Sequence, residues 1–96
     1  MQETIVFGGG GFWSAEAVFR ALKGVKSVEP EHVGSPKVEV LKIVYDPDTV
    51  AFEELLQVFF KSSNPDLIFC TTDRQIKKAQ HYVKILKLPA KIEMYD

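Results

Sequence analysis

Four consecutive glycines, residues 8–11, stand between a short apolar run and the start of an expected helix, and Phe12 and Trp13 follow them directly. Glycine lets the backbone adopt a positive φ or approach a ligand closely. A glycine-rich turn that opens a helix presents backbone N–H groups, which suit an anion or a polar oxygen. The stretch lacks the Gly-Lys-Ser/Thr of a phosphate-binding loop and the spacing of a dinucleotide fingerprint. Taken alone, the pattern favours a tight turn over a ligand site.

Few other residues are of types that do chemistry. Cys70 is the only cysteine, and its place at the end of an apolar run is typical of a partly buried strand-end thiol. A single cysteine forms no internal disulfide, which fits a reducing compartment. His32 and His81 have no cysteine or acidic residue at metal-ligand spacing, so we expect no metal site and no cofactor. No Ser-His-Asp arrangement has a motif to support it.

Composition and charge narrow the class of protein. The 96 residues predict a single domain over 1–96 with one modest core. A formal net charge of −1 gives no electrostatic reason to expect nucleic acid or an anionic membrane as a partner. The first residues do not resemble a signal peptide, and no apolar run approaches the length of a membrane span. We therefore expect a cytoplasmic protein.

The hydrophobic pattern predicts where the elements lie. Strands are expected over 4–7, 25–33, 37–45, 67–70 and 91–95, and helices after Ser14, over 51–61, and after Thr71 or Thr72. Pro30 favours a sheet edge for its strand. The inward faces predicted for the first two helices are Ala17, Val18, Ala21 and Leu22, and then Phe52, Leu55, Leu56 and Phe59.

This order of elements is β-α-β-β-α-β followed by α-β. It predicts an α+β fold of the ferredoxin-like, split βαβ type with an antiparallel sheet. Right-handed crossovers place the first strand between 37–45 and 67–70. The glycines at its end then lie beside the starts of those two strands. We call this place, where the glycine run, Glu39 and the turn 64–66 are expected to meet, the glycine edge.

Several blocks of the sequence resemble the A-type peptide methionine sulfoxide reductases. The run from Gly9 to Trp13, followed by Glu16 and Phe19, resembles that family's Gly-Gly-Cys-Phe-Trp signature. The likeness continues through Gly24-Val25 and Ser27-Val28. It is strongest over "EVLKIVYDPDTVAFEELLQVFFKSSNP" and resumes at "LIFCTTDRQIKKAQ". Together these blocks cover most of the chain.

The resemblance implies a role for each matching position. In that family a cysteine thiolate at the helix N-terminus attacks the sulfoxide sulfur and becomes a sulfenic acid, which thiols then reduce. Its position here is Gly11. A glutamate that helps to protonate the sulfoxide oxygen matches Glu39. The apolar wall against the substrate methyl group matches Phe12 and Trp13, although on their own these two aromatics are better explained as core packing.

The sequence also departs from the family pattern. Gly11 carries no nucleophile. Only about ten residues separate Val28 from Glu39, where the family has a much longer loop with a buried tyrosine and a Gly-His motif. Between Pro65 and Leu67 an aspartate-bearing loop that ends in Gln-Tyr-Arg is missing. The resemblance therefore implies a degenerate, shortened homologue.

Three functions from different classes remain open. The first is a catalytically inactive reductase-like module that binds methionine sulfoxide or an oxidised peptide, or serves a structural role. The second is an active peptide-methionine (S)-S-oxide reductase that uses Cys70, although four residues of strand place that thiol about 13 Å from the glycine edge. The third is a ferredoxin-like interaction module that resembles heavy-metal-associated domains without their ligands. The shortened loops also predict a homodimer or another protein partner at the glycine edge.

Overall fold

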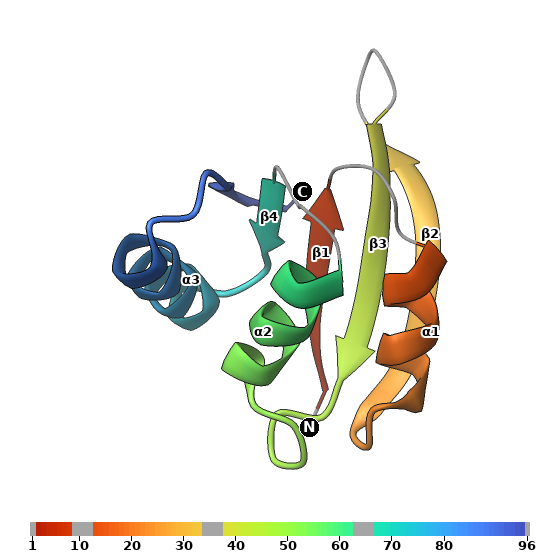
Figure 1. The fold of residues 1–96 in the computed structure, drawn as a ribbon. Coiled ribbons are helices and arrows are strands. Elements are labelled where there is room, and N and C mark those ends of the chain that lie inside the picture. The colour runs from red at the N-terminus through yellow and green to blue at the C-terminus, as the bar shows by residue number, and fades with distance from the viewer. Residues whose placement is uncertain (1, 9–12, 34–37, 63–66, 96) are drawn as a thin grey trace.

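A computed structural model describes residues 2–8, 13–33, 38–62 and 67–95, without the side chains of 13–15, 33, 38 and 62. Helices and strands follow one another in the predicted order (Figure 1). Their bounds are β1 Glu3–Gly8, α1 Trp13–Ala21, β2 Val25–Val33, β3 Val38–Tyr45, α2 Phe52–Ser62, β4 Leu67–Cys70, α3 Asp73–Leu86 and β5 Lys91–Met94. The bounds agree with the predicted ones to within one or two residues.

The described strands form one sheet in the order β2-β3-β1-β4-β5. The first strand lies between β3 and β4 and is antiparallel to both, as predicted. Pro30 belongs to β2, which is an edge strand, and this prediction is also confirmed. The missing N–H of proline explains the position, because an outer strand edge needs no donor there.

The prediction of an antiparallel sheet was wrong for its last strand. β5 pairs with β4 in parallel, with Ile68 opposite Ile92. The reason is the connection, since α3 carries the chain back along the sheet before β5 begins, and a helical crossover joins parallel strands. The fold is therefore α+β with a mixed sheet and three described helices.

The core lies between one face of the sheet and the helices (Figure 1). Its centre is aromatic, because the rings of Phe7, Phe19 and Phe59 stand 4.0 to 6.0 Å apart and join β1, α1 and α2. The four residues predicted to form the buried stripe of α2 are all buried. The stripe predicted for α1 was wrong: Phe19 is fully buried, whereas Val18 is 41% exposed.

Local chemistry fixes the ends of the elements. Gly24 has φ +99° after α1, and a Cβ there would lie 3.0 Å from atoms of Thr49 and Val50. After β3 the carboxylate of Asp46 accepts hydrogen bonds from the backbone N–H of Asp48 (2.9 Å) and the hydroxyl of Thr49 (3.0 Å). These two bonds lower the pKa of the Asp46 carboxyl. Each turn is thus specified by the residues in it.

Candidate functional site

The register of the sheet brings together the elements predicted to meet at the glycine edge. Gly8, the last residue of β1, lies opposite Val40 of β3 and Leu67 of β4. Gly8 is buried, and a Cβ there would lie 3.1 Å from the Cβ of Leu67. A side chain at this position would require Leu67 to shift by a few tenths of an ångström, so the first glycine of the run fits a tight contact between β1 and β4.

The predicted site residues are only partly described. Gly11, Phe12 and the turn 64–66 lie outside the described residues. Trp13 is the first residue of α1, and its side chain is also outside them. Glu39 lies on β3, one residue before the partner of Gly8, and its side chain is exposed. Its strand thus places Glu39 next to the end of β1.

The register also reveals a neighbour of Glu39 that the sequence interpretation set aside. His32 of β2 lies directly opposite Glu39, and both residues are exposed. The signal was available in the sequence, since the two residues flank a short turn between two predicted strands. His32 was considered there only as a metal ligand.

Cys70 lies away from this edge. It pairs with Ile5, three residues along β4 from Leu67, which is about 10 Å at a rise of roughly 3.4 Å per residue. The residue is fully buried in the core. Burial raises the pKa of its thiol to about 11, because an apolar surrounding disfavours the thiolate. The geometry is that of a core residue.

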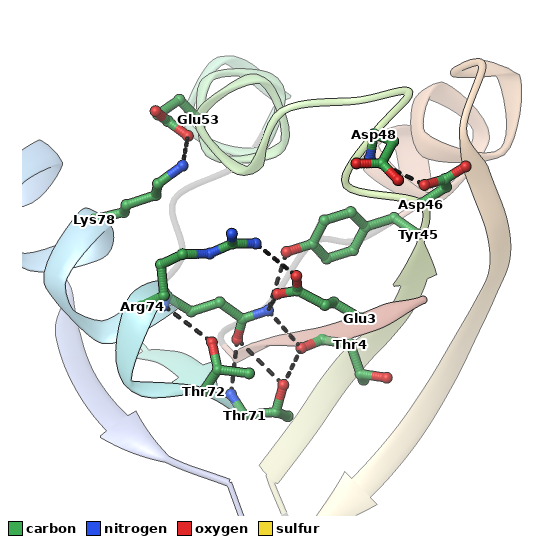
Figure 2. A network of polar contacts seen from close by, with 11 residues as sticks. Glu3, Thr4, Tyr45, Asp46, Asp48, Glu53, Thr71, Thr72, Arg74 and Lys78 are labelled. Atoms are coloured by element: carbon green, nitrogen blue, oxygen red, sulfur yellow. Dashed lines mark hydrogen bonds and ion pairs between the residues drawn. The ribbon is translucent and has the colours of Figure 1, made fainter. Parts of the chain in front are cut away.

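The opposite end of β1 holds a buried polar cluster that the sequence interpretation missed (Figure 2). Gln75 of α3 is 1% exposed. Its side-chain N–H₂ donates to the carbonyl of Thr4 (3.0 Å) and to the hydroxyl of Tyr45 (3.0 Å), and its carbonyl accepts from the backbone N–H of Thr71 (2.7 Å). No pattern in the sequence indicates these contacts, because they join residues from three separate elements.

Charges complete this cluster at the surface. Arg74 forms an ion pair with Glu3 (2.7 Å), and the carboxylate of Glu3 also accepts from Gln75 (3.3 Å). Desolvation raises the pKa of Tyr45 to about 12, although the hydrogen bond with Gln75 acts in the opposite direction. Among the described residues, every buried side-chain nitrogen or oxygen has a hydrogen-bond partner. Because its buried polar atoms are all paired, the cluster holds α3 and β1 together.

Other features of the described chain offer no stronger site. A shallow cavity of about 180 Å³ lies beside Arg20 and Lys26, and one of about 220 Å³ lies between α2 and α3, beside Tyr82. No group of three or more His, Cys, Asp or Glu residues within the described ranges could hold a metal ion. No described helix has the length and apolar character of a membrane span.

The family model for peptide methionine sulfoxide reductase matches residues 3–92. The chain belongs to this family. A peptide methionine sulfoxide reductase of Sulfolobus acidocaldarius is 36% identical over 79 residues, which make up 67% of this chain and 45% of that protein. One of Picrophilus torridus is 26% identical over 121 aligned positions that cover 95% of this chain and 68% of the relative.

Solved structures of the peptide methionine sulfoxide reductase family have the same fold. Methionine sulfoxide reductase A of Corynebacterium diphtheriae superposes with a TM-score of 0.74 at 20% identity, covering 97% of this chain and 64% of that one. Mxr1 of Saccharomyces cerevisiae, solved in complex with Trx2, gives 0.68 at 20% identity, with coverages of 95% and 73%. The chain spans about half the length of the curated relatives it matches.

Proposed function

We propose that this chain is a catalytically inactive member of the family that binds methionine sulfoxide in oxidised peptides. The observation that carries the proposal is the position of the only thiol. Gly11 stands where the resemblance puts the nucleophile, and Cys70 is fully buried with the pKa of its thiol raised to about 11. A buried thiol of high pKa is a poor nucleophile.

One further observation supports a loss of the chemistry. The alignment with the Picrophilus torridus relative runs over 121 positions although this chain has only 96 residues, so it contains gaps in this chain. Such gaps agree with the two shortened loops that the sequence implies. The edge that would carry the retained residues is nevertheless intact in its backbone pairing, with Gly8 between Val40 and Leu67.

The reductase assay tests the inactive state. The protein is incubated with a methionine sulfoxide peptide and dithiothreitol, and the methionine formed is measured by chromatography. We expect no reduction above the blank for the native protein or for Cys70→Ser. Reduction by the native protein that Cys70→Ser abolishes would instead establish the alternative, an active peptide-methionine (S)-S-oxide reductase that uses this thiol.

A fluorescence titration tests binding. Trp13 is the only tryptophan, so a saturable change on addition of a methionine sulfoxide peptide reports on the start of α1. We expect saturation that is lost in Phe12→Ala, because the resemblance assigns Phe12 and Trp13 to the wall around the methyl group. A flat trace with the native protein would contradict a binding role.

The order of the first four strands supports assigning the fold to the ferredoxin-like type, with β1 between β3 and β4. The heavy-metal-associated modules share this geometry and bind metal through a pair of cysteines. Cys70 is the single cysteine here. No observation on the described residues favours this third function over peptide binding.

A further inference from the structure

Positive charge is concentrated on α3 and the segment that follows it. Residues 73–91 hold six of the chain's 12 lysines and arginines but only one of its 13 aspartates and glutamates. The net charge of −1 therefore combines a basic segment with an acidic remainder. Such a separation of charge favours a partner of opposite sign at the basic surface.

Part of this charge is neutralised within the molecule. Arg74 forms its ion pair with Glu3, and Lys78 forms one with Glu53 of α2 (3.4 Å; Figure 2). Three lysines of α3 and its C-terminal cap have no carboxylate within ion-pair distance in the described chain: Lys77, Lys84 and Lys87. These charges are available to a partner.

Two of these lysines share one side of α3 with an apolar residue. Lys77, His81 and Lys84 follow one another at intervals of four and three residues, which places them on one side of a helix. All three are exposed, and Ile85, four residues after His81, is 63% exposed. We call these four residues the α3 face. It presents cationic groups around an apolar side chain.

A cavity lies beside the α3 face, between α2 and α3. It is lined by Glu53, Lys77, Lys78, His81 and Tyr82. The ring of Tyr82 stacks on that of Phe60, with centroids 6.0 Å apart. The volume of about 220 Å³ exceeds the roughly 150 Å³ that accommodates a benzene ring. The cavity therefore has room for one apolar side chain of a partner.

We propose that the α3 face and this cavity bind an acidic peptide segment of another protein, with one apolar side chain of the peptide in the cavity and its carboxylates on Lys77 and Lys84. This surface is separate from the proposed methionine sulfoxide site and does not depend on it. An anionic membrane fits less well. An interfacial helix buries a wide apolar face in lipid, and the apolar side of α3, which includes Ala79, is packed in the core.

The test measures the fluorescence anisotropy of a fluorescein-labelled peptide in which one leucine lies among glutamates and no methionine is present. We expect saturable binding that weakens as salt is added, because salt screens exposed charges. Lys77→Gln and Lys84→Gln should each weaken binding about threefold, the size of one exposed ion pair. Lys23→Gln, at an exposed lysine after α1, should bind like the native protein.

Two neighbouring glutamates of α2 give the most direct comparison. Glu53 pairs with Lys78 and lines the cavity, whereas Glu54 is exposed and belongs to neither contact. Glu53→Gln should tighten binding about threefold, because it frees Lys78 and removes a carboxylate that repels the peptide. Glu54→Gln should leave the affinity nearly unchanged. Urea midpoints confirm that the variants are folded, as expected for exposed positions.

Four results would overturn the proposal. A flat anisotropy trace would exclude binding of the acidic peptide. Equal affinity for a peptide with serine in place of leucine would exclude the cavity from the contact. Equal effects of Glu53→Gln and Glu54→Gln would indicate general attraction between opposite charges. Binding to phosphatidylserine vesicles without binding to the peptide would assign the α3 face to a membrane surface. None of these results bears on the methionine sulfoxide titration, which uses a different peptide.

Discussion

At the scale of single residues, Gln75 makes the most concentrated set of buried contacts in the described chain. It is 1% exposed and bonds to Thr4, Thr71 and Tyr45. We expect Gln75→Leu to lower the free energy of unfolding by about 2 to 4 kcal/mol, because partners are left buried without a hydrogen bond. Urea denaturation measures the loss. An exposed glutamine on the same helix supplies the control, since Gln80→Leu should change the free energy of unfolding by less than about 0.5 kcal/mol.

Two buried acids predict how stability depends on pH. The pKa of Cys70 is raised from 9.0 to about 11, and that of Tyr45 from 10.0 to about 12, both chiefly by burial. The folded state therefore favours the neutral thiol and the neutral phenol. Their contribution to the free energy of unfolding is complete below pH 9. It is lost progressively as the pH rises toward 12.

The measurement is the urea midpoint at a series of pH values above about 8. We expect it to fall in two overlapping steps, with the lower step absent in Cys70→Ala and the upper step absent in Tyr45→Phe. A midpoint that stays level through this range would contradict the assignment of both groups to the dry core.

At the scale of elements, two lysines at the C-terminal end of α3 predict opposite effects of the same substitution. Lys87 follows the helix with φ 53° and ψ 48°, in the left-handed region that glycine adopts without strain. Lys87→Gly should therefore stabilise the protein by up to about 1 kcal/mol. Lys84→Gly, in the last turn of the helix, should destabilise it by about 1 kcal/mol. Thermal denaturation of the two variants measures whether each substitution raises or lowers the melting temperature. Equal effects would contradict the left-handed conformation of Lys87.

The elements also indicate what a sequence can predict. The stripe of α2 was predicted because Phe52, Leu55 and Phe59 recur at helical spacing and face one apolar layer. The stripe of α1 was not, because one aromatic side chain, Phe19, fills the space beside Phe7 and leaves Val18 at the surface. The choice between the two possible faces of α1 depends on this packing against Phe7, which the spacing of apolar residues in α1 does not contain.

Contacts between residues far apart in the sequence were the second feature that sequence patterns did not predict in full. The glycine edge was predicted because chain order and right-handed crossovers fix which strands neighbour β1. The direction of β5 was missed because the final helix and strand were not placed in the sheet. Gln75 and Tyr45 were not connected, because their hydrogen bond joins residues 30 apart in the sequence. His32 and Glu39 lie closer, but their pairing depends on the register of the hairpin.

At the scale of the whole molecule, the homodimer expected at the glycine edge stays a prediction. Shortened loops expose apolar surface, and such surface is often covered by a partner. Sedimentation equilibrium should give twice the monomer mass of 10.8 kDa. A mass that remains monomeric across the concentration range would contradict the dimer. It would leave the peptide-binding proposal untouched.

The central position of β1 has a consequence for how the protein is made on the ribosome. This strand is translated before its two neighbours, β3 and β4, which come from residues 38–45 and 67–70. The middle of the sheet therefore cannot close until Cys70 has left the exit tunnel. Until then the apolar run of β1 lacks its partner on the β4 side, where a chaperone can bind it. Nascent chains arrested before β4 should be protease-sensitive, and protection should arise only once that strand has emerged.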